Sequence, residues 1–372
     1  MKNNIVEFIR SKDYRFIENI GQGGTGKTVL LKDEIINEFF VCKKYLPLYK
    51  SDKEKYFRNF IDEIKILHSV FHKNVVRVFN YYLYPEKHTG YILMEFIKGT
   101  QIYDFVKSNP ETLNDIFVQT IDGFRYIEEN KILHRDIRPQ NILVSESGMV
   151  KIIDFGFGKK IEFEDDYDKS ITLNWRFSIP NEFEKKMYDT RTEVYFVGKL
   201  FEELIVNQHL ENFNYSSILF EMINNDYDSR INSFFDVSRK IITNTSNMLD
   251  FSDLDKRTYK RFASELLAFF NKKSVNAEYV SSIEYIQTEL ENIYRNSILE
   301  DIIQNPINVL NCFIRGEFYY NKKPVLHVEL LKEFINLLRS VAGDKKKIIL
   351  NNLWQRFDSI PIYQKIEDDL PF

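Results

Sequence analysis

The stretch that most constrains this chain covers residues 131–157 and reads KILHRDIRPQNILVSESGMVKIIDFGF. Its pattern predicts a loop, a tight β-hairpin and a second loop. The apolar run at residues 150–153 ends abruptly at Asp154, and Asp136 and Asn141 lie in the first loop. We therefore expect these three polar side chains to face a cleft. Two carboxylates and one amide suit a reaction in which one carboxylate accepts the proton of an attacking hydroxyl while the other holds Mg²⁺ with the amide.

The same stretch resembles the catalytic segments of eukaryotic-like (Hanks-type) Ser/Thr protein kinases. Residues 134–141, HRDIRPQN, resemble the catalytic loop H-R-D-L-x-x-x-N, and residues 154–156 resemble the metal-binding D-F-G. The order and separation of the two motifs agree with that family. The resemblance covers residues 14–240 and implies a bilobal α+β fold. A small β-rich N-lobe would span residues 14–97, and a helical C-lobe residues 98–240.

The glycine-rich tract at residues 21–28, GQGGTGKT, allows two interpretations. The kinase pattern G-x-G-x-x-G and the P-loop pattern G-x-x-x-x-G-K-T both begin at Gly21, and both bring backbone N–H groups close to phosphate oxygens. A P-loop would use Lys27 and lead directly into a helix. A kinase loop joins two antiparallel strands and leaves Lys27 solvated. Residues 29–40 do not decide between them, because their pattern also fits a helix.

Residues downstream favour the kinase interpretation. Residues 40–43, FVCK, resemble the third-strand V-A-I-K, so Lys43 is expected to bind the α- and β-phosphates, while Lys44 points the other way. Residues 51–71 predict a helix with one apolar face. Beside that face, Glu63 resembles the glutamate that pairs with the strand lysine; the alternative is a solvated helix carboxylate. The residues that the resemblance places against ATP are Ile20, Gly21, Gly23, Gly24, Gly26, Thr28, Lys43, Met94, Glu95 and Ile97.

The resemblance also assigns the chemical roles. Asp136 accepts or orients the proton of the substrate hydroxyl, and Asn141 and Asp154 hold Mg²⁺, with Mn²⁺ as an alternative ion. Arg138 stands where Ser/Thr kinases carry lysine, and its guanidinium can still contact the γ-phosphate as a planar fork. Lys43 and Glu63 complete the catalytic set. His134 is expected to be a packed, hydrogen-bonded structural residue.

The activation segment is expected at residues 157–179. Arg135 resembles the arginine that receives a phosphate on this segment, and Thr172 and Ser170 are the candidate phosphosites. A phosphate would add about −1.5 to −2 charge opposite Arg135. The acidic residues within 162–166 could supply this negative charge without modification.

Three further positions belong to the helical lobe. Glu182 closes the tripeptide P-N-E, which resembles the family's A-P-E, and Arg230 resembles the arginine that is buried with that glutamate. Glu193 replaces the aspartate that begins the central helix. Its longer side chain puts its hydrogen bonds to the catalytic-loop backbone in question. The short separation of Glu193 and Arg230 predicts that the following helix is shortened or missing.

Residues 241–372 resemble no family, and we expect an all-α extension. Residues 241–255 are polar and suggest a linker. Helices are expected at residues 259–271, 277–294, 297–313, 329–341 and 345–357. The extension is either a buttress for the kinase domain or a module for dimerisation or a regulatory partner, because amphipathic helices indicate burial and not the partner.

The composition narrows the functional class. Net charge is −4 with basic residues dispersed, so we expect no nucleic-acid partner. No apolar stretch has the length of a membrane span, and we expect no membrane partner. Two cysteines without metal-ligand spacing favour a cytoplasmic protein. Residues 1–13 form a short lead-in, and their charges argue against a signal peptide.

The leading functional prediction is a Ser/Thr protein kinase that uses ATP and Mg²⁺ to phosphorylate protein substrates. Autophosphorylation is a further expectation. One alternative is a small-molecule kinase of the same fold, against which the activation segment and Glu182 signature argue. Another is an ATP-binding pseudokinase scaffold. A P-loop ATPase is a distant further alternative, since such a protein has no use for an H-R-D loop.

Overall fold

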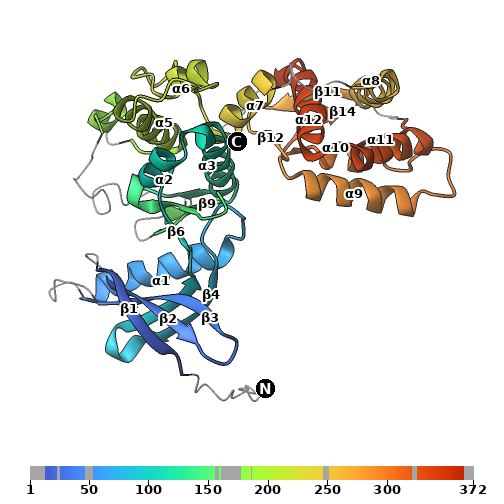
Figure 1. Ribbon diagram of the computed structural model, residues 1–372. Helices are drawn as coiled ribbons and strands as arrows, with labels where there is room; N and C mark the ends of the chain where they lie inside the picture. The colour runs from blue at the N-terminus through green and yellow to red at the C-terminus, as the bar shows by residue number, and fades with distance from the viewer. Residues whose placement is uncertain are drawn as a thin grey trace, which may run out of the picture. The chain divides into compact units, whose positions relative to one another are not determined.

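The computed structural model describes residues 13–22, 26–46, 53–155, 159–160, 177–185, 187–245, 251–320 and 325–363. The chain divides into two compact units, Met1–Ser238 and Arg239–Phe372. Figure 1 labels many of the elements of each unit. Residues 1–12 of the expected lead-in and most of the expected activation segment, including Ser170 and Thr172, lie outside the described residues.

The first unit begins with a five-stranded antiparallel sheet. Its strands are β1 (Arg15–Gln22), β2 (Gly26–Asp33), β3 (Glu38–Tyr45), β4 (Val78–Tyr84) and β5 (Thr89–Glu95), in the order β1-β2-β3-β5-β4. The glycine-rich tract therefore leads into a strand, and Lys27 lies within β2 opposite Lys44. This arrangement is incompatible with a P-loop, which would open a helix. Gly26 also allows close pairing, since a Cβ there would lie 2.5 Å from the Lys44 carbonyl oxygen.

A helix packs on this sheet. Helix α1 (Lys53–Ser69) buries Phe57 and Phe60, and the ring of Tyr45 lies 5.6 and 5.2 Å from theirs. Successive strand residues alternate between the two faces of a sheet. Lys43 and Tyr45 of β3 therefore share the face that meets α1. Phe40 lies on the opposite face.

The remainder of the first unit is mainly helical. Its helices are α2 (Ile102–Ser108), α3 (Leu113–Glu129), α5 (Thr190–Asn207), α6 (Ser216–Met222) and α7 (Phe234–Thr245), the last of which continues past the unit boundary. Short strands are β6 (Gly99–Gln101), β7 (Ile132–Leu133), β8 (Ile142–Ser145), β9 (Val150–Ile152) and β10 (Lys159–Lys160). Among the described residues, 3-10 turns occur between β4 and β5 at η1 (Pro85–Lys87) and in the helical part at η2 (Pro110–Thr112), η3 (Pro139–Asn141) and η4 (Asn181–Lys185). The expected combination of a β-rich part and a helical part is confirmed.

Two features of the helical part position the site. Strands β8 and β9 pair as the predicted hairpin, and β6 pairs with β8 on its other side. The central helix α5 buries Phe196 and Phe201, and Phe201 packs edge-on against Phe117 of α3 with 4.9 Å between ring centroids. The seven-residue α6 is the one helix between the end of α5 and Arg230, a stretch that is described in full. The prediction of a shortened helical insert agrees with this.

The second unit mixes helices with short strands. Its helices are α8 (Asp253–Ala268), α9 (Ile283–Asn296), α10 (Ile307–Asn311), α11 (Val328–Ser340) and α12 (Gly343–Asp358). Its strands are β11 (Phe270–Ser274), β12 (Glu278–Tyr279), β13 (Ile314–Arg315), β14 (Phe318–Tyr320) and β15 (Ile362–Tyr363). Phe262 of α8 and Phe334 of α11 stack in its core with centroids 3.8 Å apart.

The expectation of an all-α extension is therefore wrong. Strand β11 pairs with β14 and β15, and β12 pairs with β13. Strands of two to five residues are too short to show alternation, and they are stabilised by pairing with distant segments. Residues 241–245 also continue helix α7 where a linker was expected, and the helix expected at 297–313 is reduced to α10.

No helix in the described part of the chain combines the length and the apolar character that crossing a bilayer requires.

Gly99 offers a test of the packing between β6 and β8. A Cβ on Gly99 would lie 2.0 Å from the Val144 carbonyl oxygen, so the pairing of the two strands depends on the missing side chain. We expect Gly99→Ala to lower the free energy of unfolding by about 1–3 kcal/mol, as overpacking does. Urea denaturation followed by circular dichroism measures this. Gly343→Ala is the matched control, because nothing lies within 4 Å of a Cβ there. Equal effects of the two substitutions would contradict the steric argument.

Candidate active site

Lys43 joins two carboxylates that are distant from it in sequence. Its ammonium Nζ lies 2.6 Å from Oε1 of Glu63 on α1 and 2.9 Å from Oδ1 of Asp154, which follows β9. Lys43 and Glu63 are buried. Burial opposes the charge of Lys43, but the charges of Asp154 and Glu63 outweigh it and raise the pKa of the ammonium. Lys43 is therefore a fixed positive charge. It lies beside Asp154, which ends the apolar run at residues 150–153.

Asp136 and Asn141 meet at the start of the β8–β9 hairpin. The Asn141 Nδ2 amide donates to the Asp136 carbonyl oxygen at 2.9 Å and to its carboxylate Oδ2 at 2.8 Å. Arg138 lies on the same carboxylate, with Nη2 3.1 Å from Oδ2. The guanidinium thus rests against Asp136 and remains half exposed. The two loops carrying Asp136 and Asp154 are linked, because the Ile153 N–H donates to the Asn141 carbonyl at 2.9 Å.

His134 links the two loops through hydrogen bonds to both. The Asp136 N–H donates to His134 Nδ1 at 3.3 Å, so Nδ1 is the acceptor and Nε2 carries the proton that it donates to the Ile153 carbonyl at 3.0 Å. Burial lowers the pKa of the His134 imidazole, which agrees with this neutral tautomer. Its ring packs 4.8 Å from that of Phe155. His134 is therefore packed and hydrogen-bonded, as predicted.

The backbone is strained at two of these positions. Arg135 has φ of 63° and Asp154 has φ of 62°, values that non-glycine residues adopt rarely. Each such residue costs about 1–3 kcal/mol and persists only where its surroundings fix it. At Arg135, the fixing contact is a hydrogen bond of 2.7 Å from its backbone N–H to Oε1 of Glu193.

Glu193 lies buried beneath the catalytic loop. Its Oε1 accepts from the Arg135 N–H and from the Tyr188 hydroxyl, the latter at 3.1 Å. The longer side chain therefore does reach the loop, which answers the question raised by the replacement of aspartate. Burial raises the pKa of the Glu193 carboxyl to about 7, although these hydrogen bonds oppose the shift. Tyr188 also carries the Arg135 guanidinium over its ring at 5.4 Å, and nothing in the sequence indicated its part in the site.

Glu182 and Arg230 form the buried pair that the sequence predicted. Arg230 Nη1 lies 2.5 Å from Oε1 of Glu182, and Nη2 lies 3.2 Å from Oε2. Both side chains are almost fully buried. The Thr192 hydroxyl donates to Glu182 at 3.1 Å, so the pair is tied to the first turn of α5. This fixes the chain that precedes α5 against the helical part of the first unit.

The residues expected around a nucleotide are placed by the five-stranded sheet. Gly21 pairs with Thr28 across the β1–β2 hairpin, Thr28 pairs with Lys43, and Ile20 is partly exposed. Gly23 and Gly24 lie outside the described residues.

The expected hinge follows β5. Met94 pairs with Val41 of β3 and is half-buried, as is Ile97 just beyond the strand. The Glu95 N–H donates to the Arg77 carbonyl at 2.9 Å, and its carboxylate binds Lys151 Nζ at 2.7 Å. Nothing in the sequence predicted this ion pair between β5 and β9.

Comparison with known proteins yields one family and many relatives. A family model described as a protein kinase domain matches residues 14–286, more than half of the chain. A probable serine/threonine-protein kinase MRK1 homolog of Encephalitozoon cuniculi is 29% identical over 202 residues, which are 52% of this chain and 60% of the relative. Serine/threonine-protein kinases PknA of Corynebacterium glutamicum is 34% identical over 165 residues, or 42% and 35% of the two chains. Serine/threonine-protein kinase PrkC of Bacillus subtilis is 26% identical over 200 residues, or 52% and 30%.

The aligned part is less than two thirds of the length of each of these relatives.

The raised pKa of Glu193 predicts a specific pH dependence of stability. The folded protein holds a proton on Glu193 up to about pH 7, whereas an unfolded glutamate releases it near its ordinary pKa of 4.5. The folded state binds more protons between these values, so stability falls as the pH rises through them. Relative to Glu193→Gln, we expect the free energy of unfolding to drop by on the order of 3 kcal/mol between pH 4.5 and 7 and to stay level above. Urea unfolding of both proteins across this range measures it, and parallel curves would refute the shift.

Proposed function

The chain belongs to the protein kinase family, and on this premise we propose that it is an ATP-dependent protein kinase acting on serine and threonine hydroxyls of protein substrates. The observation that carries the proposal is the double ion pair of Lys43 with Glu63 and Asp154, 2.6 and 2.9 Å long. It sets a fixed cation beside a carboxylate, as binding of a metal-bound polyphosphate requires. The names of the relatives support serine and threonine as acceptors.

The nucleotide would lie between the β1–β2 hairpin and the β8–β9 hairpin. Lys43 binds the α- and β-phosphates, and the backbone of the glycine tract at residues 20–28 covers the phosphates. Residues 94–97 meet the adenine. The Asp154 carboxylate and the Asn141 amide would hold Mg²⁺ or Mn²⁺, which suits ions that prefer oxygen ligands. When bound there, such an ion would supply positive charge that offsets the charge of the phosphates.

Transfer itself would use the side chains at the start of β8. Asp136 orients the substrate hydroxyl and takes its proton as the oxygen attacks the γ-phosphorus. Arg138 leaves the Asp136 carboxylate, which it contacts at 3.1 Å, and binds the γ-phosphate with its planar fork. Asn141 then remains as the group that keeps Asp136 oriented, through its bond to Oδ2 of 2.8 Å.

Two observations favour this proposal over its alternatives. The buried Glu182–Arg230 pair fixes the segment that follows the expected activation segment, a feature that argues against a small-molecule kinase. Lys43 contacts Glu63 and Asp154, and Asn141 contacts Asp136, so both parts of the expected catalytic set are assembled, which argues against a pseudokinase scaffold. Two buried free cysteines agree with a cytoplasmic location. We extend the proposal to autophosphorylation at Thr172 or Ser170, and to a regulatory or dimerising role for residues 241–372.

The proposal is tested by following label from ATP in the presence of Mg²⁺ and a generic protein substrate. We expect label on serine and threonine of the protein substrate, and Asp136→Asn to lower turnover by about 10²–10⁴-fold. Asp104→Asn is the control, because Asp104 is an exposed acid on α2. Label found only on small molecules would favour the small-molecule kinase, and absence of transfer by the unchanged protein would favour the scaffold. An unchanged rate in Asp136→Asn would remove Asp136 from the proton-accepting role.

A matched pair of lysines separates the two interpretations of the glycine tract by activity. Lys43 and Lys27 lie on neighbouring strands, but only Lys43 contacts Glu63 and Asp154. We expect Lys43→Ala to lower kcat/KM by on the order of 10²–10³-fold, as loss of a preorganised charge contact does. Lys27→Ala should leave it within about 2-fold, since that side chain has no assigned phosphate contact. The reverse ranking would refute the assignment of Lys43.

A further inference from the structure

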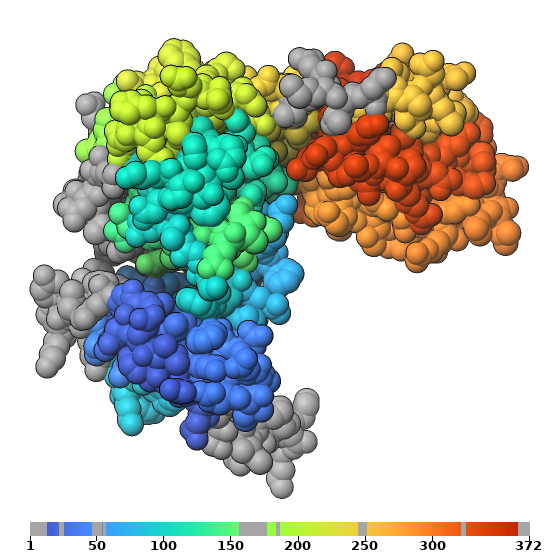
Figure 2. Space-filling view, viewed as in Figure 1, coloured from blue at the N-terminus to red at the C-terminus, as the bar shows by residue number. Residues whose placement is uncertain are grey.

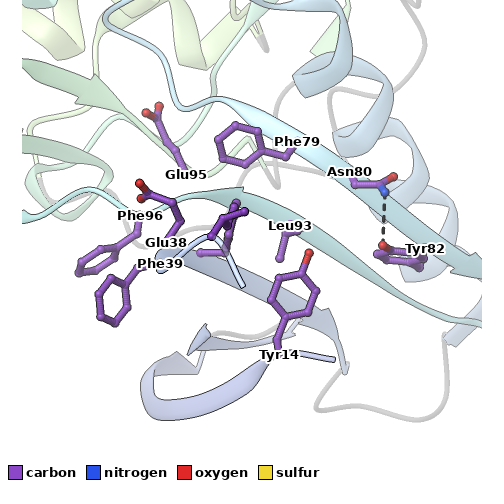
Figure 3. A pocket seen from close by; sticks show the side chains of 11 residues that line it. Tyr14, Glu38, Phe39, Phe79, Asn80, Tyr82, Leu93, Glu95 and Phe96 are labelled. Atoms are coloured by element: carbon purple, nitrogen blue, oxygen red, sulfur yellow. Dashed lines mark hydrogen bonds between the residues drawn. The ribbon is translucent and has the colours of Figure 1, made fainter. Parts of the chain in front are cut away.

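A hollow lies on the first unit, on the face of the five-stranded sheet opposite Lys43. Its volume is about 600 Å³. Aromatic side chains dominate its lining, namely Tyr14, Phe39, Phe40, Phe79, Tyr82 and Phe96. Figure 3 shows the rings of Tyr14 and Phe79 near Leu93 at the centre of the hollow. Phe40 points to this face because it alternates with Lys43 along β3.

The rings form an open apolar surface. Phe40 packs edge-on against Tyr14 and Phe79, with centroids 5.8 and 5.4 Å apart. Phe79 is nevertheless 46% exposed, and Ile36 at the rim is 55% exposed. In the space-filling view, strands β1 to β3 of this sheet, in blue, lie at the molecular surface (Figure 2). A contiguous exposed apolar patch of this kind marks a binding surface.

The charges around the hollow favour a basic occupant. Glu38 and Glu95 both line it. Glu95 is neutralised by Lys151, but Glu38 is exposed and makes no ion pair within the described ranges of the chain. The rings also accept cations, since the Arg77 guanidinium lies 5.2 Å from the centroid of Phe79. The hollow therefore suits a short apolar segment that carries lysine or arginine.

The chain itself supplies such a segment next to the hollow. Residues 1–12 read MKNNIVEFIRSK, with the apolar residues Ile5, Val6, Phe8 and Ile9 beside the basic residues Lys2, Arg10 and Lys12. This segment joins the described chain at Asp13, one residue before Tyr14, whose ring lines the hollow. We propose that residues 1–12 bind in this hollow, with Phe8 and its apolar neighbours against the rings and a basic side chain near Glu38.

Because residues 1–12 are covalently joined to the chain beside the hollow, weak contacts are sufficient for them to bind there. An extended chain of this length reaches at most roughly 40 Å, so every lining residue is within its range. A short tether also gives an effective concentration on the order of millimolar, which favours the chain's own segment over a free peptide or a second copy. The proposal does not depend on phosphotransfer.

Photo-crosslinking of the full chain tests the proposal. A benzophenone amino acid replaces Phe8, and mass spectrometry maps the crosslink. We expect a crosslink within one chain to residues 36–40, 79–82 or 93–96. We also expect Phe79→Asp to abolish it. Phe71→Asp is the matched control, because Phe71 also carries Arg77 over its ring at 5.3 Å but does not line the hollow, and it should retain the crosslink.

The outcomes are decisive even where Phe79→Asp perturbs folding, because the crosslink map of the otherwise unchanged protein stands by itself. A crosslink elsewhere in the chain, or none, overturns the proposal. A crosslink to the same residues at the mass of a dimer also overturns it and assigns the hollow to a second copy. Circular dichroism of both aspartate variants establishes that a lost crosslink reports lost binding.

Discussion

The buried ammonium of Lys43 is the constraint on which the site depends. A buried charge is tolerated only with close partners, and here Glu63 and Asp154 supply them at 2.6 and 2.9 Å. Their three positions lie on β3, on α1 and after β9, so satisfying one charge fixes the sheet, the helix and the second hairpin together. Tyr45, two residues along β3, packs on the same helix through Phe57 and Phe60 and holds the strand in register with α1.

A second set of buried contacts fixes the backbone conformation of the loop that carries Asp136. Arg135 adopts a left-handed conformation beside Asp136, and the carboxyl group of Glu193 accepts a hydrogen bond from its N–H. Glu193 lies in the first turn of α5, whose start is fixed by a capping box between Asp189 and Thr192. Thr192 also donates to Glu182, the partner of Arg230. The strain at the catalytic loop is therefore balanced by a chain of buried polar contacts through the end of one helix.

The sequence indicated candidate site residues, but it did not indicate the contacts around them. The H-R-D and D-F-G segments are local, so their resemblance to known kinase motifs was enough to propose Asp136, Asn141 and Asp154 as site residues, and apolar periodicity indicated the face of α1 beside which Glu63 lies. Tyr188 and the pairing of Glu95 with Lys151 were not foreseen, because their partners lie far away in sequence and their residue types are ordinary. The reach of Glu193 was open for the same reason, since only the packed position of α5 determines it.

The ambiguity of the glycine tract and the unpredicted strands of the second unit have the same physical cause. Residues 21–28 satisfy two motifs, and what separates them is that residues after Gly26 pair with β3 instead of forming a helix, a choice made by the partner strand. In the second unit, β11 has the polar sequence FNKKS and becomes a strand through β14 and β15, which lie about 45 and 90 residues later in the chain. Local sequence reports burial periodicity; it does not report which segment supplies the missing hydrogen bonds. The strand that carries Lys43 could be predicted only because other motifs in the chain, such as the H-R-D loop, favoured a kinase fold.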